Sequence, residues 1–397
     1  MAALDQFLAE ENRKTREASL WRTLRTVENL SATEILVDGR KLLNFSTNDY
    51  LGYSCHPGVV GPAIEALNRY GPGGRSSRLI SGNLDLHREL ERKLAAFKGT
   101  EASLIFPTGF MANLGLVSSV LGEGDAILID RLNHASLIDA ARLSKCRIFV
   151  YEHGSVPSLK KVLERTEVYR KRLVATDSLF SMDGDLAPLP DLVRVCRERK
   201  VWLMIDDAHA TGVLGENGVG LADHFGMMGQ VDIVMGTLSK ALGSQGGFIC
   251  GSKELIEYLV NKSRPFIFTT ALSPVNCAAS IAALDLVKKE PERRRKLLNS
   301  ARQVREAVKE KFPSESRLIG PDVTPIIPVH AGSAKRALRL SKALSDEGFF
   351  IPAIRPPTVP KNESRLRISV SSEHSERDVR LLLDSLSKCI ERDPEES

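Results

Sequence analysis

Apolar residues in the middle of the chain gather in short continuous runs, and the stretches between these runs show the spacing of amphipathic helices. The runs cover residues 103–106, 126–129, 147–151, 173–176, 201–205, 231–235 and 247–250. Continuous apolar runs of this length are typical of strands buried on both faces. Their alternation with helices predicts an α/β fold in which a mostly parallel sheet lies between helices.

The two ends of the chain have other patterns. Near the N-terminus, apolar residues at 35–37 and 42–45 flank Asp38-Gly39, a pair that favours a hairpin turn. After residue 285, a long charged helix over 291–311 leads into a smaller α+β pattern. Its expected elements are strands at 326–329, 349–354 and 366–370 and helices at 333–347 and 375–390. We therefore expect an N-terminal arm and hairpin (1–45), a large domain (46–285) and a small C-terminal domain (286–397).

Composition narrows the class of protein. The chain has 397 residues, of which 42% are hydrophobic and 26% charged, and no apolar run approaches the roughly 20 residues that span a bilayer. The N-terminus lacks the apolar core of a secretory signal. The net charge of +5 is spread along the chain, which argues against nucleic-acid binding. We expect a cytoplasmic protein that binds neither membranes nor nucleic acid.

Cysteine usage points the same way. None of the six cysteines forms a C-x-x-C pair or has a histidine at the spacing of zinc ligands. We therefore expect reduced, buried thiols in a reducing compartment and no metal site.

Candidate chemistry lies just after the apolar runs, because ligands of open α/β sheets bind beyond the carboxyl ends of the strands. Asp206, Asp207 and His209 follow the run 201–205. A lone aspartate there is more often a helix cap or a turn residue. Here a second acid and a histidine follow, which favours a different role. An ionised carboxylate can keep a heteroaromatic nitrogen protonated. Pyridoxal 5′-phosphate (PLP) needs such a partner as an electron sink, and Asp206 is the better candidate because it follows the strand directly.

Lys240 follows the run 231–235. A lysine in a loop is normally a surface charge. Here small residues surround it, and partial desolvation favours the neutral amine that attacks an aldehyde. The hydroxyl of Thr237 and the glycines at 243, 246 and 247 suit the close approach of a phosphate. We therefore expect Lys240 to carry PLP as a Schiff base.

Two turns add weaker signals. Gly109 lies where a strand turns into a helix, and free amides at a helix N-terminus bind phosphate, although such turns occur in every α/β fold. His134 opens another helix, which Asn133 is expected to cap. The ring of His134 is either an ordinary first-turn side chain or a group that lies over an aromatic cofactor.

With these residues in place, the chain resembles the α-oxoamine synthases, fold-type I PLP enzymes that join an amino acid to an acyl thioester and release carbon dioxide. The likeness runs from about residue 20 to about residue 390. It is most specific in the segments 48–52, 133–136, 180–185, 206–212 and 237–240. It implies a PLP-dependent acyltransferase that works as a homodimer with its active site at the subunit interface.

The resemblance implies a role for each catalytic residue. Lys240 would hold the cofactor and then remove the Cα proton of the substrate. Asp206 would keep the pyridine nitrogen protonated, while His209 and Ser181 would bind the 3-oxygen of the ring. His134 would stack on the ring and donate to the acyl carbonyl. The phosphate ligands would be Gly109, Phe110 and Thr237, with Thr269 and Thr270 reaching in from a partner subunit.

The resemblance also implies the substrates. The residues around Arg355 most resemble the members that condense L-alanine with a pimeloyl thioester in biotin biosynthesis. Arg355 would bind the alanine carboxylate, Asn48 would help to orient it, and Thr358 belongs to the same substrate-binding segment. Arg22, with Arg25 as a rival, would bind the distal pimeloyl carboxylate or the acyl carrier. The carrier, either CoA or a carrier protein, is left open.

Two positions depart from the family pattern. Arg75 and Ser76 stand where many members have glycine, which leaves the loop geometry and the acyl-donor contacts open. Asp177 stands where relatives often have glutamate, a conservative difference. A 2-amino-3-ketobutyrate CoA ligase, or another α-oxoamine synthase that uses glycine or serine, is the alternative within the family.

Two other classes are less well supported. A nucleotide-binding dehydrogenase would carry G-x-G-x-x-G after its first strand and an acid about 20 residues later, and the sequence lacks that pattern. A cofactor-binding regulator or an inactive homologue would not need Lys240, Asp206 and His209, all of which are present.

Overall fold

The structure, a computed structural model, describes residues 3–316, 318, 320 and 323–393. The chain forms two compact units. The larger unit comprises Asn48–Ser181 and Asp185–Arg295, and the smaller one comprises Met1–Thr47, Met182–Gly184 and Lys296–Ser397. The three-domain division expected above, with boundaries near 45 and 285, stays a prediction.

The larger unit is built on a seven-stranded sheet with the strand order β4-β10-β9-β8-β7-β5-β6. The strands are β4 (Ala102–Phe106), β5 (Ala126–Asp130), β6 (Arg147–Tyr151), β7 (Arg172–Asp177), β8 (Trp202–Asp206), β9 (Ile233–Thr237) and β10 (Gly247–Gly251). β10 runs antiparallel to β4 and β9, and the pairs from β9 to β6 are parallel. The predicted α/β fold with a mostly parallel sheet is confirmed.

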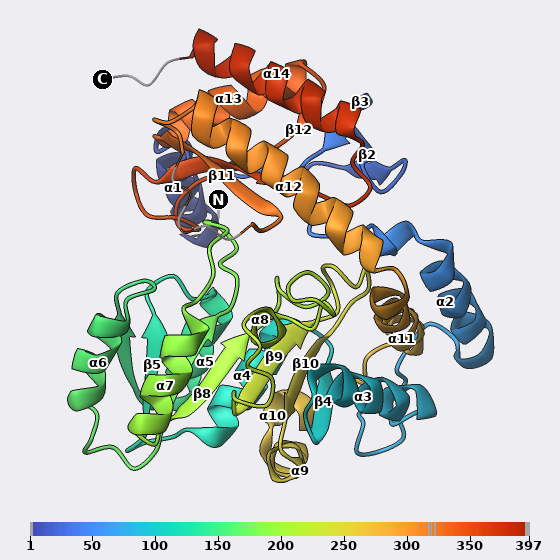
Figure 1. Ribbon diagram of the computed structural model, residues 1–397, viewed down its shortest axis with the longest axis vertical. Coiled ribbons are helices and arrows are strands. Elements are labelled where there is room, and N and C mark those ends of the chain that lie inside the picture. Colours follow the sequence, from blue (N-terminus) through green and yellow to red (C-terminus); the bar gives the residue numbers. More distant parts are fainter. Residues whose placement is uncertain (1–2, 317, 319, 321–322, 394–397) are drawn as a thin grey trace. The chain divides into compact units, whose positions relative to one another are not determined.

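Helices cover both faces of this sheet (Figure 1). The helices of the larger unit are η1 (Tyr53–Cys55), α2 (Pro57–Tyr70), α3 (Asp85–Lys98), α4 (Gly109–Val120), α5 (Ala135–Ser144), α6 (Val156–Glu164), α7 (Leu189–Glu198), α8 (Leu221–His224), α9 (Lys253–Lys262), α10 (Arg264–Ile267) and α11 (Pro274–Lys289). The core cluster joins Leu116 and Val117 of α4 to Ile127, Leu173 and Ile233 of the sheet. This burial explains why the strands read as continuous apolar runs.

The smaller unit contains two small sheets, ordered β1-β2-β3-β12 and β11-β14-β13. Its elements are α1 (Ala3–Glu17), β1 (Val27–Asn29), β2 (Glu34–Val37), β3 (Arg40–Asn44), β11 (Ile326–Gly332), α13 (Ala334–Asp346), β12 (Phe349–Phe350), β13 (Ala353–Ile354), β14 (Ser364–Ser369) and α14 (Glu376–Arg392). The long helix α12 (Pro291–Lys311) contains the boundary between the units at Arg295.

Two sequence-based expectations are wrong in detail. The single strand expected over 349–354 is two short strands, β12 and β13, which belong to different sheets. Pro352 lies between them, and because proline has no amide N–H it interrupts a hydrogen-bonded ladder. All six cysteines are free, but Cys55 is exposed rather than buried, because it ends a short surface turn. In the part of the chain that the structure describes, no helix has the length and apolar character needed to cross a bilayer.

Candidate active site

The carboxyl ends of the central strands bring the predicted residues to one edge of the sheet. Asp177 at the end of β7 pairs in register with Asp206 at the end of β8, and Asp206 pairs in turn with Met235 of β9. β10 starts at the same edge, where Gly247 lies between Phe106 and Thr237. The residues that follow β4, β5, β8 and β9 therefore meet at one place, as expected for an open α/β sheet.

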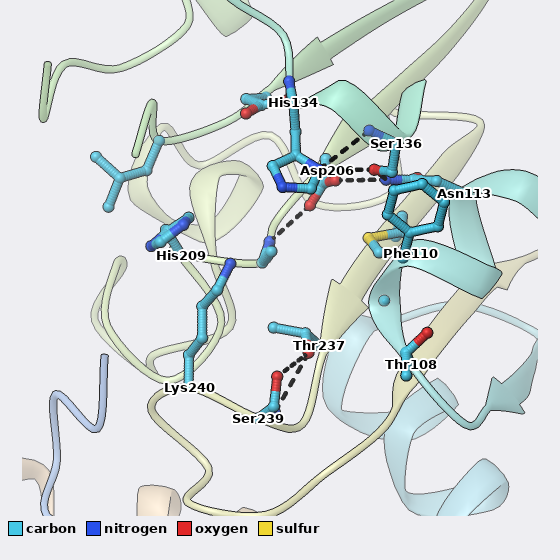
Figure 2. A pocket seen from close by; sticks show the side chains of 15 residues that line it. Thr108, Phe110, Asn113, His134, Ser136, Asp206, His209, Thr237, Ser239 and Lys240 are labelled. Atoms are coloured by element: carbon cyan, nitrogen blue, oxygen red, sulfur yellow. Dashed lines mark hydrogen bonds between the residues drawn. The ribbon is translucent and has the colours of Figure 1, made fainter. Parts of the chain in front are cut away.

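A cavity of about 260 Å³ opens at this edge. Among the residues that line it are seven that the sequence singled out: Gly109, Phe110, His134, Asp206, His209, Thr237 and Lys240. Figure 2 shows the side chain of Lys240 extending into this cavity beside His209. A nucleophilic amine, a carboxylate and two imidazoles thus share one small pocket.

One end of the pocket is suited to an anion. Helix α4 begins at Gly109, and the side chain of its N-cap, Thr108, accepts a hydrogen bond from Met111 N at 3.1 Å. The first amides of any helix lack an intrahelical acceptor and carry partial positive charge. A Cβ atom at Gly247 would lie only 2.5 Å from the Cα of Gly109, so glycine alone lets β10 run against this turn. The hydroxyl of Thr237, 2.7 Å from that of Ser239, lies beside the same turn.

Two carboxyl groups sit side by side in the pocket, and their surroundings differ. Asp206 accepts hydrogen bonds from Asn113 Nδ2 at 2.9 Å and from Ala208 N at 3.0 Å. Asp177 is deeply buried, and burial, together with the nearby charge of Asp206, raises the pKa of its carboxyl well above the ordinary value. The raised pKa favours a proton on the Asp177 carboxyl.

The turn that carries His134 is tied to β7. His134 itself, rather than Asn133, is the N-cap of α5, so the expected cap is wrong. Asn133 instead uses its side chain across the sheet, where its Nδ2 donates to Ala175 O at 2.8 Å and its Oδ1 accepts from Asp177 N at 3.1 Å. These bonds hold the backbone of His134 against Asp177, whose Oδ1 accepts His134 N at 3.2 Å.

Asn48, an expected substrate ligand, connects to the pocket through a tyrosine. Tyr50 is fully buried, and its hydroxyl lies 2.7 Å from Nδ1 of His209. The same hydroxyl donates to Asn48 Oδ1 at 3.3 Å. A phenol has a single proton. When that proton goes to Asn48, Nδ1 of His209 must be the donor to the tyrosine oxygen.

The remaining predicted residues do not line the cavity. Ser181 follows β7 in the larger unit, and Thr269 and Thr270 follow α10. The other three, Arg22, Arg355 and Thr358, belong to the smaller unit. Within that unit Arg22 Nη2 donates to Pro356 O at 2.8 Å, while Arg355 donates to the backbone oxygens of Ser19 and Trp21. Their roles as ligands stay predictions.

Sequence reasoning missed several polar residues of the site. Thr108, Asn113 and Ser136 all line the cavity. Asn113 carried a usable signal, because it is the one polar side chain in the first half of helix α4, and such buried amides almost always have partners.

A histidine next to the site links two of its loops. His153 Nδ1 lies 2.9 Å from Asp130 Oδ1, and His153 Nε2 lies 2.9 Å from Asp185 Oδ2. Asp130 ends β5, just before the turn that carries His134, and Asp185 ends the loop that carries Ser181. Burial opposes a charge on His153, but the two carboxylates outweigh it and raise its pKa to about 10.

Replacing His153 with glutamine is expected to lower the free energy of unfolding by a few kcal/mol in a pH-dependent way. The folded pKa of about 10 exceeds the unfolded value of about 6.5, so the stabilisation is complete below pH about 6.5 and is lost as the pH rises through about 10. Denaturant unfolding of both proteins across this range measures it. A difference in stability that stays constant with pH would contradict the charged bridge.

Comparison with known proteins agrees with this geometry. A profile of the class I and II aminotransferases matches residues 40–386. An 8-amino-7-oxononanoate synthase from Lysinibacillus sphaericus is 44% identical over 372 residues, which are 94% of this chain and 95% of that protein. A solved structure described as SPT with PLP internal aldimine superposes with a TM-score of 0.92 at 30% identity and covers 99% of both chains. An 8-amino-7-oxononanoate synthase from Francisella tularensis gives 0.76 at 27% identity, over 89% of this chain and 98% of that one.

Fold, pocket and comparisons together define a fold-type I enzyme that depends on PLP. The chain belongs to the class I and II aminotransferase family, in the branch formed by the 8-amino-7-oxononanoate synthases. The resemblance to the α-oxoamine synthases is thereby confirmed. The pocket fits PLP chemically, since it offers an amine for an aldehyde, a charged carboxylate for a pyridinium and the N-terminus of α4 for a phosphate.

Proposed function

We propose that this enzyme condenses L-alanine with a pimeloyl thioester, releases carbon dioxide and the free thiol, and so forms 8-amino-7-oxononanoate for biotin biosynthesis. The observation that carries the proposal is the near-full-length identity of 41–44% to curated relatives that bear this enzyme's name. SPT structures superpose better than the solved 8-amino-7-oxononanoate synthase, but at only 30% identity. A shared fold does not define a substrate, so we base the choice of substrates on the relatives with 41–44% sequence identity rather than on the superposed structures.

Bound PLP supplies an aldehyde for the amino group and a protonated ring that draws electron density from the amino-acid α-carbon. Lys240 is the residue that holds the cofactor and then takes the Cα proton of alanine as general base. Asp206, which accepts hydrogen bonds from Asn113 and Ala208, keeps the proton on the pyridine nitrogen. His209 and Ser181 bind the ring 3-oxygen. The phosphate is held by the amides of Gly109 and Phe110 and by the hydroxyl of Thr237.

His134 is the donor to the acyl carbonyl oxygen, on which negative charge develops when the new carbon–carbon bond forms. Arg355 binds the alanine carboxylate, which later leaves as carbon dioxide, and Asn48 and Thr358 help to orient the substrate. Arg22, with Arg25 as the rival, binds the far carboxylate of the pimeloyl chain or its carrier. The carrier is CoA or an acyl carrier protein.

The enzyme works as a cytoplasmic homodimer in this proposal, and Thr269 and Thr270 complete the phosphate site of the partner subunit. An exposed apolar side chain next to these threonines supports a surface that the partner subunit covers. The side chain of Phe268, the residue before them, is 71% exposed. Large apolar side chains left this open are typical of surfaces that a second protein chain covers.

Incubation of the PLP-loaded protein with L-alanine and pimeloyl-CoA is expected to release free CoA at a steady rate. A thiol reagent measures the CoA, and mass spectrometry identifies 8-amino-7-oxononanoate. Glycine and serine in place of alanine, and acetyl-, succinyl- and palmitoyl-CoA in place of pimeloyl-CoA, form the control panel. Turnover confined to glycine or serine with another acyl-CoA would move the enzyme to a different α-oxoamine synthase activity.

A further inference from the structure

Four polar side chains form an unbroken hydrogen-bonded path along one wall of the pocket (Figure 2). Asn113 Nδ2 donates to Asp206 Oδ2 and to Ser136 Oγ, both at 2.9 Å. Ser136 Oγ lies 2.7 Å from Nδ1 of His134. The path joins the end of β8 to α4 and the first turn of α5, and Asn113 and Ser136 are each 1% exposed.

The protons along this path can be placed one by one. Asp206 accepts only, so the amide group of Asn113 must turn its NH₂ toward that carboxylate. The same NH₂ donates to Ser136 Oγ, whose remaining neighbour on the path is Nδ1 of His134. The hydroxyl proton of Ser136 therefore points at Nδ1. The backbone N–H of Ser136 also donates to Nδ1, at 3.3 Å.

Nδ1 of His134 thus faces two donors and has to act as an acceptor, since a protonated Nδ1 would lose both bonds. We infer that Asn113 and Ser136 are positioning residues that fix neutral His134 in the tautomer with its proton on Nε2. This inference deepens the proposed function, on which its catalytic part rests, because it makes Nε2–H the single donor that the ring can offer to an acyl carbonyl. Through Asn113, the orientation of this donor is also coupled to the charged Asp206.

The charges around His134 are compatible with a neutral ring. Desolvation in the pocket lowers the pKa of His134, Lys240 lowers it further, and Asp206 and Asp139 oppose the shift. Asp177, which accepts the backbone N–H of His134, has a raised pKa that favours its neutral form. The ring is therefore neutral near pH 7, which is the state that the tautomer argument requires.

The variant Ser136→Ala tests whether Ser136 sets the tautomer of His134 or only stabilises the fold. The full-length, PLP-bound protein with ¹⁵N-labelled histidine reports the tautomer through its ring nitrogen shifts, and loss of one signal pair in His134→Gln assigns His134 among the eight histidines. Wild type is expected to show protonated Nε2 alone at neutral pH. Ser136→Ala is expected to show a mixture of tautomers and a higher His134 pKa. The turnover number should fall about five- to tenfold, the worth of one neutral hydrogen bond, with little change in the KM for alanine.

Ser144→Ala is the matched control, because Ser144 lies on the same helix, is buried, and donates to Ala141 O at 2.8 Å away from the pocket. It should leave the His134 signals and the turnover number at wild-type values. Asn113→Leu provides a second variant of similar volume, and it should weaken PLP binding to the apoprotein by loosening Asp206.

The inference is overturned if His134 keeps the wild-type tautomer and pKa in Ser136→Ala, or if wild type already carries its proton on Nδ1. Because the nitrogen shifts are measured without substrate, they stand or fall independently of the CoA-release assay. Failure of the proposed function and failure of the proton path are thus distinguishable.

Discussion

Replacing Lys240 with alanine is expected to lower the rate of thioester consumption by about 10⁴-fold, the largest effect of any substitution in the protein. The change removes both the amine that holds the cofactor and the base that takes the Cα proton, and among the residues that the structure describes no second lysine lines the cavity. Steady-state CoA release with alanine and pimeloyl-CoA measures the loss. Lys253→Ala is the matched control, because the Lys253 side chain is 72% exposed on α9.

A chemical readout accompanies the kinetics. Borohydride treatment of the PLP-loaded protein should attach the cofactor permanently to one residue, and peptide mass spectrometry should locate it at Lys240. Lys240→Ala should remain unlabelled while its unfolding transition stays close to that of wild type. Labelling of another lysine, or a Lys240→Ala variant that retains a tenth or more of the activity, would refute the central assignment.

Asp206→Asn is expected to lower the turnover number by about 10²–10³-fold, a loss comparable to removal of one preorganised electrostatic contact in an active site. The amide has nearly the same shape as the carboxylate but no charge with which to hold a proton on the pyridine nitrogen. The contacts to Asn113 and Ala208 need an acceptor, which the amide oxygen can supply for one of the two. Turnover numbers and the visible absorption band of bound PLP, followed against pH, report the change.

Asp177→Asn provides the comparison that isolates charge from shape. Asp177 lies beside Asp206 on the neighbouring strand, but its raised pKa favours the protonated, neutral carboxyl. Replacing a neutral carboxyl with a neutral amide should change the turnover number only a few-fold. Equal losses in the two variants would contradict the role of Asp206 as the carboxylate that holds the proton on the pyridine nitrogen.

The strands, and with them the most reactive residues, could be predicted because their signals are local. Lys240, Asp206 and Gly109 each follow an apolar run by a few residues, and runs buried on both faces are visible in sequence. The contacts that support them are not local. Asn113 and Asp206 are 93 residues apart, and they meet only because β8 ends beside the N-terminal half of α4. Nothing in the spacing of the residues encodes that proximity.

Errors in the secondary structure had the same origin. The split of 349–354 into β12 and β13 depends on which sheet each half joins. The exposure of Cys55 likewise depends on where its turn lies on the folded unit. A residue's own type predicts average burial, whereas its neighbours in space decide the individual case.

For the active site, the sequence alone determined which groups are present: a lysine, two acids, two imidazoles and a phosphate-binding turn. Each of them follows a strand, and the carboxyl ends of parallel strands lie at one edge of the sheet. Only the tertiary structure decided their protonation. It buries Asp177 beside Asp206, which raises the pKa of the Asp177 carboxyl, and it places two hydrogen-bond donors at Nδ1 of His134. The reason is physical, because desolvation and hydrogen bonding depend on distances of a few ångströms between groups that the chain separates by tens of residues.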